Sequence, residues 1–114
     1  MEIRIEGRID RAIPRGHVIE RLRGALRRVP ARRVRACVRF DDVNGPKGGN
    51  DIRCAIVVEV AGRPPLRVTR LAATPRLAFD AGYERLVRRL DDAAERRQEQ
   101  RRHPKKHFAA RRLL

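Results

Sequence analysis

The chain of 114 residues is long enough to bury one hydrophobic core and too short for two ordinary domains. Hydrophobic residues make up 41% of it, which excludes a wholly disordered protein. Its 29 lysines and arginines outnumber its 14 acidic residues, so the formal net charge is +15. Because such a surplus cannot be neutralised internally, the excess charge must face water or an anionic partner.

Simple patterns exclude several classes of protein. The longest apolar run, 54–58, falls far short of the roughly 20 residues that cross a bilayer. Charged residues alternate through the opening of the chain, without the apolar stretch of a signal peptide. The two cysteines form neither a disulfide framework nor a zinc motif. We therefore expect a soluble cytoplasmic protein.

A change of hydrophobic period defines the first two elements. Apolar residues alternate with charged ones over 3–9, which predicts a half-buried strand. After Pro14 the apolar positions follow one stripe of a helix, which predicts a helix that ends before Pro30. The stripe consists of Val18, Leu22, Ala25, Leu26 and Val29.

Three further strands are predicted in the middle of the chain. The alternation returns over 33–40, where valine, alanine and phenylalanine face one side and arginines the other. A loop dense in turn residues follows over 41–50, and 52–60 provides the next apolar face. The segment 61–65 has the composition of a hairpin turn, and 66–72 is interpreted as a fourth, less regular strand.

The last helix has a clear start signal, because the Thr74 hydroxyl can cap it and Pro75 suits its first position. Apolar residues keep helical spacing from there to about Gln100. The segment 101–114 carries six basic residues and no acid, and we interpret it as a flexible basic tail. The folded domain is therefore assigned to 1–100.

The element order β-α-β-β-β-α predicts an α+β fold in two layers. We expect a four-stranded sheet with both helices packed on one face, where their apolar stripes can be buried. The second and third strands, joined by a loop, should pair antiparallel.

The charges of both predicted helices are separated by flank. On the first helix, Arg21 and Arg28 lie on one flank of the apolar stripe, and Arg23 and Arg27 lie on the other. The second helix places a basic ridge (Arg85, Arg89, Arg96) opposite an acidic one (Asp80, Glu84, Asp91, Glu95). Acids four positions apart repel each other, so helix stability alone does not favour this separation.

With the basic tail, these helices favour an anionic polymer as partner, bound along one continuous strip of guanidinium groups. Guanidinium groups pair bidentately with phosphate. Aromatic residues make up only 4% of the chain, so phosphate-led binding of structured RNA is favoured over stacking of single strands. Two alternatives stay open: a solvated helix face with accidental charge separation, and an adaptor whose acidic ridge binds a basic protein.

No motif indicates an enzyme, a cofactor or a metal site. The cysteines are expected to be structural thiols, and the histidines, on the first helix and in the tail, do not converge. The loop 45–49 lacks the Gly-Lys-Ser/Thr ending of a phosphate-binding loop, although Lys47 at its tip can reach RNA. The adjacent Asp41 and Asp42 point to opposite sides of an extended strand and so cannot form a catalytic pair.

Three segments resemble one known family: the opening 3–8 (IRIEGR), the loop 42–49 (DVNGPKGG) with the DIRC that follows at 51–54, and the helix segment 77–80 (LAFD). In this order and spacing they resemble the ribosome hibernation promoting factor family, also called ribosome-associated inhibitor, in its short single-domain type. The resemblance covers about 1–100.

The resemblance implies a bacterial, non-enzymatic translation factor of the stress response. Family members bind the small ribosomal subunit in the channel used by mRNA and tRNA, and stabilise idle ribosomes through contacts of basic helix faces with 16S rRNA. By position, Arg85 and Arg88 match basic positions of the family's last helix, and Asp80 matches its acid. No cofactor, membrane or small-molecule substrate is implied.

The candidate RNA-binding residues combine both lines of reasoning: Arg21, Arg23, Arg27, Arg28, Lys47, Arg85, Arg88, Arg89 and Arg96. Arg76 stands where the family usually has tyrosine, and Asp91 and Asp92 replace a typically basic stretch, which weakens the far half of the helix as an rRNA contact. The alternative function is a general structured-RNA or DNA-binding module without ribosome specificity.

Overall fold

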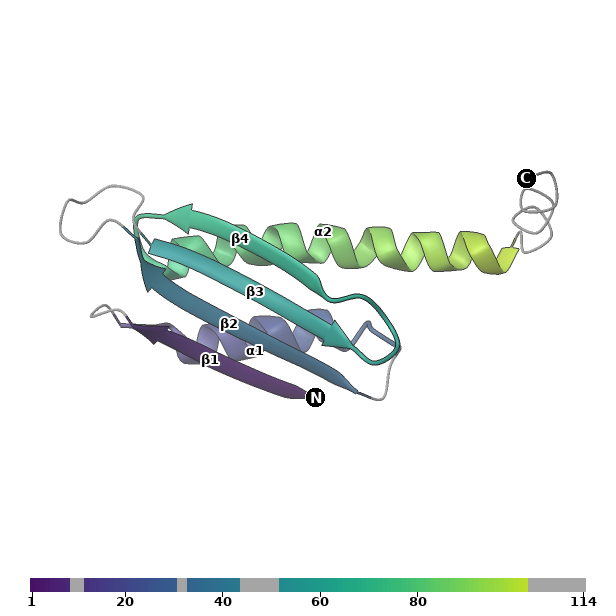
Figure 1. Cartoon of the computed structure of the whole chain (residues 1–114), viewed down its shortest axis with the longest axis horizontal. Helices are drawn as coiled ribbons and strands as arrows, with labels where there is room; N and C mark the ends of the chain where they lie inside the picture. Colours follow the sequence, from purple (N-terminus) through teal and green to yellow (C-terminus); the bar gives the residue numbers. More distant parts are fainter. Residues whose placement is uncertain (9–11, 31–32, 44–51, 103–114) are drawn as a thin grey trace.

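The computed structural model describes residues 1–8, 12–30, 33–43 and 52–102. Six elements follow one another in the predicted order β-α-β-β-β-α (Figure 1). They are β1 (Glu2–Arg8), α1 (Arg15–Leu26), β2 (Val34–Asp42), β3 (Ile52–Val60), β4 (Leu66–Ala72) and α2 (Pro75–Arg102).

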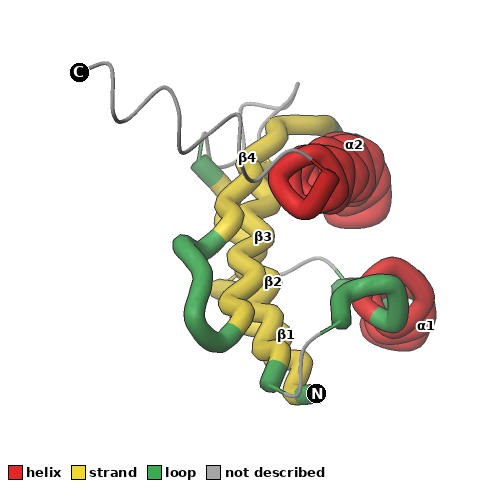
Figure 2. Tube along the Cα trace, turned by 90° about the vertical axis from the view of Figure 1, so that its right-hand side faces the viewer, coloured by secondary structure: helices red, strands yellow, loops and turns green. Residues whose placement is uncertain are grey.

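The four strands form one mixed sheet in the order β1-β2-β3-β4. β1 and β2 are parallel and joined through α1, whereas β2, β3 and β4 run antiparallel to their neighbours. The predicted antiparallel pairing of the second and third strands is confirmed, with Val38 opposite Ile56 at its centre. Both helices cover the same face of the sheet, as Figure 2 shows, so the predicted two-layer α+β fold is also confirmed.

Strand alternation and helical stripes meet in one core between the two layers. The alternate residues of β2 and β3 that face the helices are buried, and Phe40 is fully inaccessible to solvent. Phe79 of α2 and Leu22 of α1 are fully buried as well. Each such side chain contributes roughly 1.5–3 kcal/mol on burial, so the core fixes the positions of both helices against the sheet.

The predicted start of α2 is confirmed. The backbone N–H of Leu77 donates to Oγ1 of Thr74 at 3.2 Å, and Pro75 is the first helical residue. α2 has 28 residues and is about 42 Å long at the usual rise, whereas the strands have 7 to 9 residues. Its C-terminal part therefore extends past the end of the sheet (Figure 1).

Three predicted boundaries differ from the structure. α1 ends at Leu26, so Arg27 and Arg28 lie in the turn that follows it. β2 continues through Asp41 and Asp42, which pair with Arg53 and Ile52, so the loop begins later than predicted. The pairing with β3 continues to these two residues, and the Asp41 carboxylate also accepts hydrogen bonds from the guanidinium groups of Arg39 on β2 and Arg53 on β3. α2 runs to Arg102 instead of Gln100; the remainder of the predicted tail and the loop residue Lys47 lie outside the described residues.

Within the described ranges, no helix has the length and apolar character needed to cross a membrane.

Candidate nucleic-acid interface

The two helices lie side by side and run in the same direction. Nε2 of His17 lies 2.6 Å from Oδ1 of Asp80, and Nη1 of Arg28 lies 3.5 Å from Oδ1 of Asp91. Both contacts join residues 63 positions apart, so the helices stay in step along the shared interface. One turn further along α1 from His17, the Arg21 guanidinium carbon lies 5.3 Å from the centre of a tyrosine ring of α2.

The arginines of α1 and of the turn that follows it divide between two flanks, as their spacing predicts. Arg21 and Arg28 lie on the flank that faces α2, where Arg21 contacts the Tyr83 ring. Arg23 and Arg27 are exposed on a different flank, and neither side chain has a hydrogen-bond or ion-pair partner among the described residues. This second pair is free to bind an anion.

Three arginines of α2, Arg85, Arg89 and Arg96, lie on the flank away from α1, whereas Arg97 lies between the helices. Nη1 of Arg89 donates to the backbone carbonyl of Arg67 in β4 at 2.7 Å, which places this flank against the edge strand. Arg85 and Arg96, four positions before and seven after, share the flank by helical spacing and are exposed. Nη2 of Arg88 lies 3.2 Å from Oε1 of Glu84.

The guanidinium groups therefore form two basic surfaces, not the single strip predicted from the sequence. The acids Asp80 and Asp91 of α2 face α1 and pair with its side chains, and they separate the α1 arginines from the basic ridge. We call the exposed pair Arg23 and Arg27 the α1 surface. Arg85, Arg89 and Arg96 form the α2 surface.

A groove of about 430 Å³ lies between the helices. Apolar side chains line its floor, and the charged side chains of Arg28, Asp91 and Arg97 stand among its lining residues. The apolar lining consists of Ala25, Val29, Tyr83, Val87, Leu90 and Ala94. The groove thus continues the interhelical contact toward the projecting end of α2.

The sheet face opposite the helices carries arginines that are mostly paired with acids. Glu2 lies 3.2 Å from Arg4 and 3.3 Å from Arg35. Asp41 lies 3.0 Å from Arg39, and Arg53 lies 3.5 Å from the same carboxylate. These pairs leave less positive charge on this face than its arginine content suggests.

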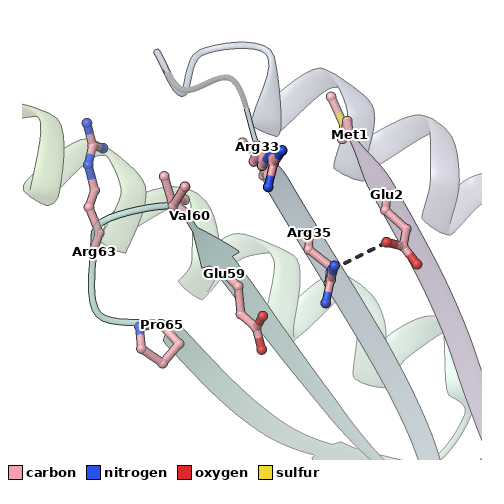
Figure 3. A pocket seen from close by; sticks show the side chains of 10 residues that line it. Met1, Glu2, Arg33, Arg35, Glu59, Val60, Arg63 and Pro65 are labelled. Carbon is pink, nitrogen blue, oxygen red and sulfur yellow. Dashed lines mark ion pairs between the residues drawn. The ribbon is translucent and has the colours of Figure 1, made fainter.

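Sequence reasoning missed a pocket of about 680 Å³ at the end of the sheet, which Figure 3 shows. Arg33, Arg35 and Arg63 line it together with Glu2 and Glu59. The alternation over 33–40 placed the first two arginines on one face, but no sequence signal brings the turn residue Arg63 to them.

Both cysteine thiols are held in the protonated form. Burial raises the pKa of Cys54 to about 12. The pKa of Cys37 is raised by partial burial and then by the nearby Glu6 carboxylate. Neither environment produces the reactive thiolate of a catalytic cysteine. Within the described ranges, no group of three or more histidine, cysteine or acidic side chains is placed to hold a metal ion.

The fold and the paired helices define a small, basic, two-layer α+β domain, and two solved structures share this fold. The N-terminal domain of Protein Y from Thermus thermophilus matches with a TM-score of 0.61 and 23% identity, over 78% of this chain and 94% of that one. A ribosomal subunit interface protein from Coxiella burnetii matches with a TM-score of 0.58 and 17% identity, over 83% and 99%. No family model and no curated protein matches the chain. At these identities the likeness establishes the shared fold.

Proposed function

We propose that the protein is a ribosome-binding inhibitor of translation. It occupies the mRNA and tRNA channel of the small subunit and stabilises idle cytoplasmic ribosomes under stress. It acts by occupying space and performs no chemical step.

One observation carries this proposal: exposed arginines on both helices of a fold shared with a ribosomal subunit interface protein. The side chains of Arg23, Arg27, Arg85 and Arg96 have no hydrogen-bond or ion-pair partner among the described residues. Four unpaired guanidinium groups on a chain of net charge +15 favour a polyanion, and rRNA phosphates have the geometry that guanidinium binds best.

The two basic surfaces suit a partner that surrounds the domain. The α1 surface and the α2 surface lie on different flanks of the helix layer. A single rigid duplex approaches the domain from one side, so it cannot contact both surfaces fully. A channel with phosphates on more than one wall can. This geometry favours the ribosomal channel over a general duplex-binding module.

Sedimentation with purified small subunits at increasing salt tests the proposal. We expect co-sedimentation at moderate salt, with an apparent affinity that falls linearly on a log–log plot against salt concentration. Nuclease-digested subunits should fail to bind; binding that survives RNA digestion would favour a protein-interaction adaptor. An affinity for duplex RNA equal to the affinity for small subunits would favour the general RNA-binding module.

Competition locates the binding site. Subunits preloaded with mRNA and initiator tRNA should bind the protein much more weakly than empty subunits. Equal binding to loaded and empty subunits would contradict occupancy of the channel while leaving ribosome binding intact.

A further inference from the structure

The pocket at the end of the sheet, lined by Arg33, Arg35, Arg63, Glu2 and Glu59, is built from fixed elements; we call it the sheet-end pocket. Glu2, Arg35 and Glu59 form one row across β1, β2 and β3. In the strand register, Arg35 lies directly opposite Glu2 on one side and Glu59 on the other. In Figure 3, Arg33 stands at the rim between Met1 and the turn that carries Arg63.

The backbone around both rim arginines is held by hydrogen bonds. The N–H of Ala61 donates to the carbonyl of Arg33 at 3.2 Å, which ties the β3–β4 turn to the chain that enters β2. The N–H of Arg63 donates to the carbonyl of Val60 at 3.0 Å, and Gly62 takes a positive φ of 79° that closes the turn. The two arginine side chains therefore start from a preorganised frame.

The charges of the sheet-end pocket are unevenly matched. Glu2 is paired with both Arg35 and Arg4, so its carboxylate is occupied and the three groups together keep one positive charge. Arg33, Arg63 and Glu59 have no ion-pair partner among the described residues. The pocket thus presents two unpaired cationic donors and one unpaired carboxylate acceptor. A complementary ligand must bring an anionic group together with a hydrogen-bond donor.

We propose that the sheet-end pocket binds one nucleotide of single-stranded RNA, with its phosphate on Arg33 and Arg63 and an amino group of its base donating to Glu59. The assignment rests on the proposed function only in taking RNA as the partner. The pocket volume, about 680 Å³, lies within the range of small-molecule sites.

A single-stranded nucleotide fits better than a duplex for two reasons. The Glu59 carboxylate needs a free base edge, and base edges in a duplex are already paired. A backbone phosphate alone could bind Arg33 and Arg63, but it offers no hydrogen-bond donor to the Glu59 carboxylate, which would repel it. Recognition by arginine and carboxylate also requires no aromatic stacking platform, which this chain of few aromatic residues lacks.

The first test measures binding of labelled single-stranded oligo(C) by fluorescence anisotropy. The double variant Arg33→Gln with Arg63→Gln should bind roughly tenfold more weakly, as expected when charge-assisted hydrogen bonds to a phosphate are removed. The control is the double variant Arg67→Gln with Arg70→Gln, at two exposed arginines of β4 outside the pocket, which removes the same number of charges and should change affinity less than twofold. An equal weakening by the two double variants would overturn the pocket assignment.

The second test separates recognition of a nucleotide from attraction of phosphate alone. Oligo(U) has no exocyclic amino group, so the protein should bind oligo(C) more tightly than oligo(U). Glu59→Met, which keeps the side-chain length and removes the acceptor, should abolish this preference. Tighter binding of both oligomers by Glu59→Met, with no preference in the unmodified protein, would overturn the base contact.

Two further comparisons keep this inference separate from the proposed function. Cytidine monophosphate should shift NMR signals of the pocket residues, and oligo(C) should shift the same signals at lower concentration. If co-sedimentation with ribosomes holds while the arginine double variant binds oligo(C) normally, the pocket assignment fails and the proposed function stands. If oligo(C) binding depends on the pocket but co-sedimentation with ribosomes fails, the pocket assignment stands and the proposed function fails. Unchanged urea midpoints show that each variant is folded.

Discussion

Nε2 of His17 lies 2.6 Å from Oδ1 of Asp80 and joins α1 to α2 across 63 positions of sequence. The His17 imidazole is largely buried and packs edge-on against the Phe79 ring, with the ring centres 5.7 Å apart. Further along the two helices, Asp91 of α2 forms a second such contact, with the guanidinium of Arg28. Part of the acidic ridge of α2 therefore serves the contact between helices, which explains a charge separation that an isolated helix would not favour.

Removal of the Asp80 carboxylate should destabilise the domain. We expect Asp80→Ala to lower the free energy of unfolding by about 1–2 kcal/mol, because His17 is then left without its partner in a mostly buried position. Asp80→Asn should cost less, since the amide oxygen still accepts a hydrogen bond. Urea unfolding followed by circular dichroism measures both. Glu95→Ala, an exposed acid on the same helix, is the control, and a destabilisation as large as that of Asp80→Ala would contradict this role.

Replacement of two glycines by alanine should change the free energy of unfolding in opposite directions. A Cβ on Gly7 would lie 2.8 Å from the backbone carbonyl oxygen of Phe40 on the neighbouring strand, so the parallel pair β1–β2 would have to separate. A Cβ on Gly24 meets no atom within 4 Å, and alanine there improves helix propensity. We expect Gly24→Ala to raise unfolding stability by roughly 0.5–1 kcal/mol. Gly7→Ala should lower it, as urea unfolding can measure; equal effects would contradict the close approach.

The order of elements was predictable because each segment has one clear hydrophobic period. The buried residues of β2 and β3 alternate, and the buried stripe of α1 follows helical spacing from Val18 to Leu26. The parallel pairing of β1 with β2 follows from the helix that joins them. The start of α2 was predictable from Thr74 and Pro75, because a hydroxyl cap and a proline at the first position are local signals, and the structure confirms both.

The distribution of charge was less predictable, because it depends on what each helix faces. A helical wheel places Arg21 and Arg28 together, but only packing shows that they face Tyr83 and the acids of α2. The Arg89 contact with a carbonyl of β4 likewise depends on tertiary structure. Arg63 joins Arg33 in the sheet-end pocket through a turn, a relation that no periodicity encodes.

The buried thiol of Cys54 should make stability depend on alkaline pH. Its pKa is raised from an ordinary 9.0 to about 12 in the folded protein, because burial disfavours the thiolate. Between pH 9 and 12 the unfolded chain therefore releases this proton while the folded chain retains it, so unfolding becomes more favourable as pH rises. Urea unfolding across this range should show a steeper decline for the unmodified protein than for Cys54→Ala.

Alkylation with iodoacetamide checks the same environments at the level of single residues. Cys54 should stay unmodified in the folded protein, because it is fully buried as well as protonated. Cys37 is partly exposed and should react, though more slowly than a free thiol, since its pKa is also raised. Mass spectrometry of the digested protein identifies which residue carries the label. Faster labelling of Cys54 than of Cys37 would contradict the assigned burial.

Charge reversal on the α2 surface should weaken ribosome binding without unfolding the protein. The Arg85 side chain is exposed and unpaired among the described residues, so Arg85→Glu removes a cation that no internal interaction uses. Arg89 is a poorer probe, because its hydrogen bond to the Arg67 carbonyl couples it to stability. We expect the log–log salt dependence of ribosome binding to become shallower by about one unit for each phosphate that the variant no longer binds.

Arg67→Glu provides the matched control for Arg85→Glu. The Arg67 side chain lies on the sheet face opposite the helices, so the same change of charge falls outside the α2 surface. If attraction were only a matter of net charge, both variants would weaken binding equally. A larger effect of Arg85→Glu, together with a shallower salt dependence, requires a phosphate at that flank. Equal effects would mean that the α2 surface does not touch the ribosome, and the α1 surface formed by Arg23 and Arg27 would then have to hold the domain there.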